Sequence, residues 1–302
     1  MKALEILRTT KELLERAGIE DAAREAEIII AHCLSIDRST LYIDNPQIPK
    51  DLTTKIDSLL KRRTKREPLQ YILGYVEFYD LKIKVGRGVL IPRPETELLA
   101  EEAIKIIKSN LLSPPHPPLT KGGQKGGGVS KGGKGGFRFL DLCTGSGCLA
   151  LTLAKEFPDV QVYGTDTSDI AIKYAKENAE LNRIKNVIFK KGPLFEPVKD
   201  LSFNLITSNP PYIKRKELKS LQPEIKDWEP GDALDGGEDG LNYYRLIIPT
   251  VKIYLKEGGY LMLELGVTQA DAVKRMAEDT GLKDITLIKD YAGIDRILVT
   301  KI

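Results

Sequence analysis

The four residues Asn209-Pro210-Pro211-Tyr212 carry the clearest chemical signal in this sequence. An amide or aromatic amine delocalises its lone pair. Two acceptors that hold both of its N–H groups can turn that lone pair toward a methyl donor. The Asn209 side-chain oxygen and the Pro210 carbonyl could be those acceptors, and Tyr212 offers a flat face for stacking. The pattern predicts methylation of a planar nitrogen, with Asn209, Pro210 and Tyr212 catalytic and all four residues, Pro211 included, contacting the acceptor. A rigid surface turn is the alternative.

A second signal is the loop Cys143-Thr144-Gly145-Ser146-Gly147, with Asp166 placed 21 residues after Gly145. The glycines let the backbone pass close to a ligand. A carboxylate at the end of the following strand can accept both ribose hydroxyls. The pair predicts a nucleoside-containing cofactor. The spacing Gly145-x-Gly147-x-x-Ala150 also satisfies the dinucleotide fingerprint, so NAD remains open at this point, as does a tight turn without a ligand.

Both signals follow expected strands in a region where strands and helices alternate. The expected strands are 137–142, 160–165, 187–190, 203–207 and 259–265. The expected helices are 149–156, 170–181, 243–255 and 268–280. The alternation predicts an α/β, doubly wound, mostly parallel sheet with its ligand at the carboxyl ends of the strands. The segments 285–289 and 295–300 should form an antiparallel pair at the end of the chain.

Residues 1–74 read differently, because apolar residues recur there at helical spacing, as in Ala26, Ile29, Ile30 and Cys33. This predicts a small all-α domain over 1–74. Residues 75–93 should form a hairpin bridge, and 94–302 the α/β domain, beginning with a helix from Pro94 to about Leu112. His32 fits a packed core position better than a ligand.

The net charge of +3 is carried by one segment. Residues 113–136 hold four lysines and no acids, which leaves 42 basic and 43 acidic residues elsewhere. Their glycine and proline content predicts a flexible insert, with a basic tether for RNA as the alternative. The basic run 61–66 predicts a solvated helix face or, alternatively, a contact surface for RNA or an acidic partner.

The composition argues against several classes of protein and of catalytic site. No apolar run has transmembrane length, and the charged N-terminus does not read as a secretory signal, so no membrane association is expected. Three cysteines without a C-x-x-C pair favour a reduced, cytoplasmic setting. Two histidines make a metal site or a Ser–His relay unexpected, and no metal is predicted.

The sequence resembles the HemK/PrmC family of S-adenosylmethionine-dependent methyltransferases. The resemblance rests on the segments Glu67–Gly74, Leu90–Glu97, Asp141–Gly147, Asn209–Tyr212 and Ala233–Leu241. It implies a class I methyltransferase fold behind a helical substrate-recognition domain. The implied reaction moves a methyl group to the side-chain amide nitrogen of the glutamine in a Gly-Gly-Gln tripeptide of peptide chain release factors. A cytoplasmic monomer that requires no nucleic acid is implied as well.

The resemblance also assigns roles to residues. The loop from Cys143 to Gly147 would hold the methionine part of the cofactor, Asp166 the ribose, and Asn209 both cofactor and acceptor. Pro193 stands where many relatives carry an aspartate near adenine, so Leu194 and backbone groups would hold the ring.

Other functions stay open at this stage. They are methylation of an exocyclic amine of adenine or guanine, glutamine methylation of a ribosomal protein, and a non-catalytic RNA-binding module. The insert is not a recognised family feature, and its deletion should preserve fold and activity.

Overall fold

The structure is a computed structural model that describes residues 1–111 and 136–302. The predicted insert at 113–136 lies outside the described residues, apart from Gly136. The described chain divides into two compact units. Unit 1 consists of Met1–Val76, Lys84–Ile91 and Lys219–Pro230, and unit 2 of Glu77–Ile83, Pro92–Leu218 and Gly231–Ile302.

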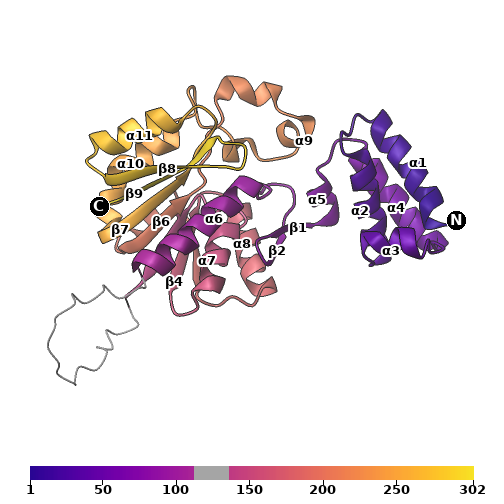
Figure 1. Ribbon diagram of the computed structural model, residues 1–302, viewed down its shortest axis with the longest axis horizontal. Coiled ribbons are helices and arrows are strands. Elements are labelled where there is room, and N and C mark those ends of the chain that lie inside the picture. Colours follow the sequence, from indigo (N-terminus) through magenta and orange to yellow (C-terminus); the bar gives the residue numbers. More distant parts are fainter. Residues whose placement is uncertain (112–135) are drawn as a thin grey trace, which may run out of the picture. The chain divides into compact units, whose positions relative to one another are not determined.

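Most of the helices and strands are labelled in Figure 1. The α-helices are α1 (Ala3–Arg16), α2 (Ala22–Leu34), α3 (Arg38–Ile43), α4 (Lys50–Arg63), α5 (Leu69–Leu73), α6 (Pro94–Ile106), α7 (Cys148–Glu156), α8 (Asp169–Leu181), α9 (Pro223–Lys226), α10 (Asn242–Tyr254) and α11 (Ala270–Asp279). The strands are β1 (Tyr75–Phe78), β2 (Leu81–Lys84), β3 (Arg138–Leu142), β4 (Gln161–Asp166), β5 (Val187–Lys191), β6 (Phe203–Ser208), β7 (Leu255–Glu264), β8 (Lys283–Lys289) and β9 (Asp295–Lys301). Short helical turns are η1 (Ile107–Leu111), η2 (Glu196–Val198), η3 (Arg215–Ser220) and η4 (Gly231–Ala233).

Unit 1 is built on helices α1 to α5, whose apolar faces enclose a core of their own. The periodic residues Ala26, Ile29, Ile30 and Cys33 are all buried there, as expected for an amphipathic helix. The prediction of an all-α segment is therefore confirmed, although the short helices α3 and α5 were not anticipated. His32 is half-buried, with its ring 6.2 Å from that of Tyr75.

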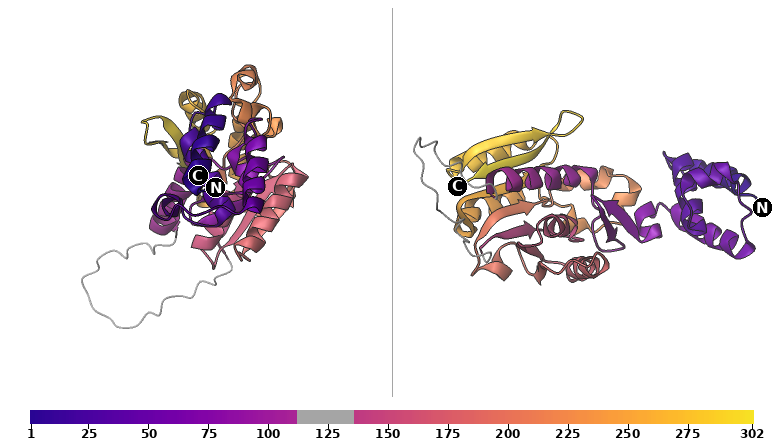
Figure 2. Two further views of the ribbon diagram at one scale, coloured as in Figure 1. Left: turned by 90° about the vertical axis from the view of Figure 1, so that its right-hand side faces the viewer. Right: turned by 60° about the horizontal axis from the view of Figure 1, so that its bottom comes forward.

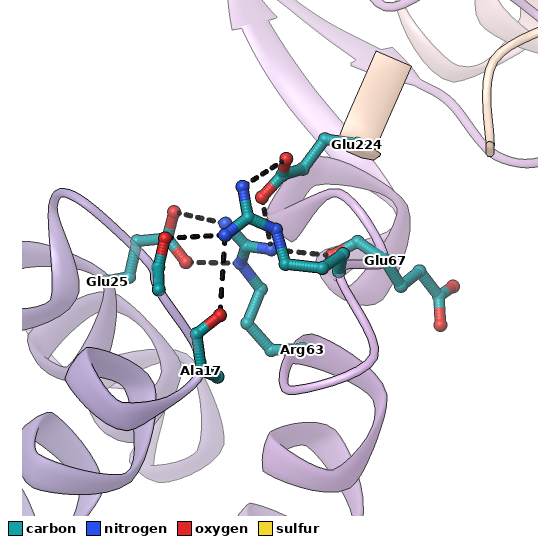
Figure 3. A network of polar contacts seen from close by, with 7 residues as sticks. Ala17, Glu25, Arg63, Glu67 and Glu224 are labelled. Atoms are coloured by element: carbon teal, nitrogen blue, oxygen red, sulfur yellow. Dashed lines mark hydrogen bonds and ion pairs between the residues drawn. The ribbon is translucent and has the colours of Figure 1, made fainter. Parts of the chain in front are cut away.

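At the end of α4, the structure contradicts the expectation of a solvated helix face at Arg63. Arg63 is only 4% exposed, and it binds Glu25 at 2.5 Å and Glu224 at 2.9 Å (Figure 3). Arg66 reaches the other oxygen of Glu224 at 2.7 Å. The run was expected to be a solvated helix face or a contact surface for RNA or an acidic partner, but Arg63 ties α4 to α2 and to α9, and Arg66 also binds α9. Of the run, the lysines 61 and 65 are exposed.

Strands β1 and β2 form the predicted hairpin, a two-stranded sheet. The turn between them includes Tyr79, which takes a left-handed backbone with φ of +48°.

Unit 2 contains a seven-stranded sheet in the order β5-β4-β3-β6-β7-β9-β8. Its strands are drawn as arrows in Figures 1 and 2. Neighbours are parallel from β5 to β7, and β9 is antiparallel to both β7 and β8. The predicted fold class and the antiparallel terminal pair are confirmed. The chain moves outward from β3 in one direction and from β6 in the other. Loops at such a point diverge and leave room for a ligand.

The two faces of this sheet are covered by different helices. Leu140 and Leu142 of β3 join a cluster that includes residues of α10 and α11. Phe139 alternates to the opposite face, where its ring meets that of Phe157 at the end of α7, with centroids 5.9 Å apart. On that side α7 contacts both α6 and α8.

Two details of unit 2 differ from the sequence prediction. Strand β7 begins at Leu255 rather than 259, because Leu255 pairs with Phe203 before the register shifts and Tyr260 pairs with Leu205. The turns η3 and η4 and the helix α9 were not predicted, since the stretch from 215 to 233 lacks a sustained apolar period. No helix among the described residues is long and apolar enough to span a membrane.

Candidate active site

Three loops lie side by side where strands β4, β3 and β6 end. Leu142 is paired with Thr165 on one side and with Ser208 on the other. The next residue along each chain segment is Cys143, Asp166 or Asn209. These three residues therefore lie at the same level at this edge of the sheet. The Ser208 hydroxyl donates to the Leu142 carbonyl at 2.9 Å, which fastens two of the loop origins together. The sheet thus brings the two sequence signals to one place.

The loop between β3 and α7 turns tightly through residues with left-handed backbones. Cys143, Gly145 and Gly147 have φ of +57°, +54° and +81°. A Cβ on Gly147 would lie 2.9 Å from the Phe189 ring and 3.0 Å from the Ala175 side chain, so only glycine fits there. A Cβ on Gly145 would meet nothing within 4 Å. The backbone at Gly145 is therefore open to a ligand, whereas Gly147 is needed for packing.

Thr144 and Ser146 are buried. The Thr144 amide donates to the Thr165 carbonyl at 3.0 Å, and the Ser146 carbonyl accepts from the Asn178 side chain at 2.9 Å. These bonds fasten the loop to β4 and α8. Burial raises the pKa of the Cys143 thiol, which favours its protonated form.

Asp166, the last residue of β4, is half-buried beside this loop. One carboxylate oxygen accepts the Gly145 amide at 2.9 Å and the other accepts the Ser168 amide at 2.9 Å. Burial raises its pKa despite these bonds. A carboxylate has about four lone-pair sites, so acceptor capacity remains for a further donor. A carboxylate with spare acceptor capacity, next to open backbone at Gly145, fits the ribose and chain of a nucleoside-containing cofactor.

Leu194 lies in the loop after β5, at the strand edge next to Asp166. Its backbone is left-handed, with φ of +42°, and its carbonyl accepts from the Thr165 hydroxyl at 2.8 Å. Its side chain is half-buried. Pro193 before it is exposed.

Asp141 belongs to the site, although no separate role was predicted for it. It is buried, accepts from the Thr144 hydroxyl at 2.6 Å and from the Thr207 hydroxyl at 3.2 Å. Burial raises its pKa to about 7. The residue holds the first turn of the glycine loop to strand β6.

Asn209 is half-buried directly after β6, and the prolines that follow it are buried. Its Nδ2 donates to the Thr96 hydroxyl at 2.9 Å. Within residues 1–111 and 136–302, the Oδ1 of Asn209 accepts no hydrogen bond. This oxygen is the group that the proposed chemistry requires.

Tyr212 is fixed mainly through its backbone. Its carbonyl accepts from Gln269 Nε2 at 2.8 Å. A Cβ on Gly236 would lie 2.8 Å from the Tyr212 backbone, and one on Gly240 would lie 2.4 Å from its carbonyl oxygen. Gly236 and Gly240 of the segment Ala233–Leu241 are thus explained by close packing against the Tyr212 turn. The segment's family character was clear from the sequence, but this packing was not.

Glu264, the last residue of β7, was not predicted as part of the site. It is 1% exposed, and burial raises its pKa to about 7. One oxygen accepts from the Thr96 hydroxyl at 2.7 Å, and the other from the Tyr212 hydroxyl at 3.4 Å. A single carboxyl group therefore contacts Tyr212 directly and Asn209 through Thr96. A carboxylate ending the apolar run Leu261–Leu263 was a sequence signal that could have revealed it.

The strand order, the glycine loop with Asp166, and the Asn209 turn define a class I methyltransferase. A family model described as a methyltransferase domain matches residues 134–293, and one described as the PrmC N-terminal domain matches residues 5–74. Among solved structures, the hMettl16 catalytic domain is similar over 83% of this chain and 82% of that chain, with a TM-score of 0.52 and 14% identity. This likeness supports the fold alone.

Curated relatives narrow the class further. A release factor glutamine methyltransferase of Thermodesulfovibrio yellowstonii is 48% identical over 299 residues, covering 99% of this chain and 98% of the relative. One of Geobacter sulfurreducens is 42% identical, covering 97% and 94%. The chain belongs to the release factor glutamine methyltransferase family.

Proposed function

We propose that this protein methylates the side-chain amide nitrogen of a glutamine in a peptide chain release factor, with S-adenosylmethionine as the methyl donor. The observation that carries the proposal is the shared register of Leu142, Thr165 and Ser208, which sets the cofactor loop and the Asn209 turn next to each other. The relatives named for this activity cover nearly the whole chain. The family resemblance points to the glutamine of a Gly-Gly-Gln tripeptide.

Binding of the cofactor is assigned to the loop Cys143–Gly147, Asp166, Leu194 and Asn209. S-adenosylmethionine supplies an electrophilic methyl group on a sulfonium. The Asp166 carboxylate would accept the ribose hydroxyls, and the backbone at Gly145 would let the methionine part approach closely. The half-buried Leu194 would cover the adenine, where no aspartate stands at position 193.

Orientation of the acceptor is assigned to Asn209, Pro210, Pro211 and Tyr212. The Asn209 Oδ1 and the Pro210 carbonyl would each accept one N–H of the glutamine amide, which turns the nitrogen lone pair toward the methyl group. Pro211 stiffens the turn, and the Tyr212 ring would stack on the planar amide. The proton on the methylated nitrogen becomes acidic once its lone pair is used, so a strong general base is unnecessary.

Recognition of the release factor is assigned to the helical region, residues 1–74. Residues 75–93 would act as its bridge to the methyltransferase region, residues 94–302. We also propose that the protein works as a cytoplasmic monomer. It should need no nucleic acid, because three arginines of its basic run are paired internally with Glu67, Glu25 and Glu224.

The direct test is a transfer assay. The protein is mixed with S-adenosylmethionine and an unmodified release factor, and methyl groups are mapped by peptide mass spectrometry. One methyl group on the Gly-Gly-Gln glutamine is the expected result. Transfer to RNA or DNA in a parallel reaction, with none to the release factor, would reject the proposal.

Asn209→Ala tests the acceptor role. Loss of one oriented hydrogen-bonding group at a reacting centre typically costs about 10²- to 10³-fold in kcat, and we expect a loss of that size. Part of the S-adenosylmethionine affinity, measured by calorimetry, should remain. Asn204→Ala, at the opposite end of β6, is the matched control and should keep near wild-type turnover. Wild-type turnover in Asn209→Ala would disprove the assignment.

A further inference from the structure

Two buried polar residues next to the proposed acceptor site have no role in the mechanism given above. Thr96 is 3% exposed and lies in the first turn of α6, and Glu264 is 1% exposed and ends β7. They are 168 residues apart in the chain, yet the Thr96 hydroxyl and the Glu264 carboxyl meet at 2.7 Å. Both lie within unit 2.

The two residues reach Asn209 through a hydrogen-bond chain with a defined direction. Thr96 donates to Glu264 Oε2, and Asn209 Nδ2 donates to Thr96. A hydroxyl has one proton to give, and the ionised carboxylate of Glu264 can only accept. When the ionised Glu264 takes the Thr96 proton, Thr96 can only accept from Asn209. The amide of Asn209 must therefore turn its NH₂ group toward Thr96.

We propose that Thr96 and Glu264 are positioning residues that hold the Asn209 amide in the one orientation in which its Oδ1 faces the acceptor glutamine. This inference rests on the proposed function of Asn209. An asparagine amide has two ends of nearly equal shape, so shape alone does not select between them. In the reversed orientation its NH₂ group would face the NH₂ group of the acceptor, and neither could accept.

The placement of Glu264 supports this role over a purely structural one. The register pairs Ser208 of β6 with Leu263 of β7. Asn209 follows Ser208 and Glu264 follows Leu263, so these two residues lie side by side. Its second oxygen is 3.4 Å from the Tyr212 hydroxyl. A buried carboxyl group without a cationic partner costs stability compared with an apolar side chain. Within the described residues Glu264 forms no ion pair. Its contacts with Thr96 and Tyr212 are therefore the role that accounts for a carboxyl group at this buried position.

The test compares Thr96→Val, which keeps the shape and removes the hydroxyl, with Thr96→Ser, which keeps the hydroxyl. Thr96→Val should lower kcat for the release factor about 10- to 100-fold, because misplacing a reacting group has effects of that order. The S-adenosylmethionine affinity should stay within about twofold of wild type, as expected for a change confined to the acceptor side. Thr96→Ser should recover most of the lost kcat.

Thr300→Val is the matched control, because the Thr300 hydroxyl is buried in β9 and donates to the Lys283 carbonyl at 2.7 Å, away from Asn209. Its kcat should not fall. Equal losses in Thr96→Val and Thr96→Ser would show that Thr96 acts by packing, and an undiminished kcat in Thr96→Val would overturn the proposal.

A second readout is independent of the substrate. The Asn209 side-chain NH₂ signal in a ¹⁵N-labelled protein is assigned by its absence in Asn209→Ala. That signal should shift in Thr96→Val but hardly in Thr96→Ser. An unchanged signal in Thr96→Val would refute the hydrogen-bond chain even if the wild-type protein proved to methylate another substrate. Failure of wild-type transfer to release factor, with the shift present, would instead reject the proposed function alone.

Discussion

Each unit of this protein buries charge, and the two do so in opposite ways. In unit 1, the buried Arg63 lies between Glu25 and Glu224 and so has an opposite charge in contact on each side. Burial alone would lower the pKa of Arg63, but these carboxylates keep it above its ordinary value. In unit 2, the carboxyl groups of Asp141 and Glu264 are supported by hydroxyl groups, and burial raises the pKa of each to about 7.

The difference separates charge that holds a fold together from charge that holds a reactive group in place. A compensated cluster such as that of Arg63 is strongly destabilised when one partner is lost. A carboxyl group supported by neutral donors contributes little to stability and can lower it, yet it dictates the direction of the hydrogen bonds around it. Replacing one buried ionisable side chain by methionine in each unit therefore tests the comparison.

The largest expected effect is on stability in unit 1. Arg63→Met keeps the length of the side chain but leaves the half-buried Glu25 without its cation and Glu224 with Arg66 alone. Breaking a buried pair in this manner costs about 3–5 kcal/mol, and chemical denaturation should show a loss of that order in the transition of the helical region. A loss below about 1 kcal/mol, the size typical of surface ion pairs, would erase the distinction between the units.

The same replacement in unit 2 should act on turnover. In Glu264→Met the Thr96 hydroxyl loses its acceptor and becomes free to donate to Asn209, which favours the reversed amide. We expect kcat to fall about 10-fold or more, while the free energy of unfolding near pH 8 stays within about 1 kcal/mol of wild type or rises. A variant that is strongly destabilised but turns over normally would assign Glu264 to the fold instead.

The pH dependence of stability sharpens the contrast. A carboxyl group whose pKa is raised on folding binds its proton more tightly in the folded state. Its contribution to the free energy of unfolding is therefore fully present below its pKa in the unfolded state. This contribution is lost as the pH rises toward its pKa of about 7 in the folded state. For Asp141 and Glu264, stability should rise between about pH 7 and pH 5, by at most about 1.4 kcal/mol per pH unit for each group.

Urea denaturation at a series of pH values measures this slope. Glu264→Met removes one of the two groups, so its slope should be shallower than that of wild type. A slope of equal size in both proteins would mean that Glu264 does not titrate differently on folding.

The smallest effect is expected at the partly exposed end of the arginine cluster. Arg62 pairs with Glu67 at 2.5 Å, but its side chain is 42% exposed. Solvent weakens such a pair, so Arg62→Ala should cost less than about 1 kcal/mol in the same denaturation experiment. A cost comparable with that of Arg63→Met would show that exposure does not set the strength of these pairs.

Much of the fold, and the place of the candidate site in it, could be predicted from local sequence. The strand–helix alternation after residue 137 predicted the parallel sheet, because each element carries its own apolar period and its own end signals. The loop Cys143–Gly147, Asp166 and the Asn209 turn could be placed at one edge of that sheet, since all of them follow strands. Their individual contacts with cofactor and acceptor remain predictions.

Tertiary structure alone decided which polar side chains are buried and what they contact. The run 61–66 looks like a solvated surface in the sequence, yet Arg63 is buried because Glu25 and Glu224 arrive from segments 38 and 161 residues away. Thr96 stands inside a motif that the sequence made conspicuous, but its partners Asn209 and Glu264 lie 113 and 168 residues further along. A hydrogen bond depends on a distance of about 3 Å between two atoms, and no local pattern of residues carries that information across a folded chain.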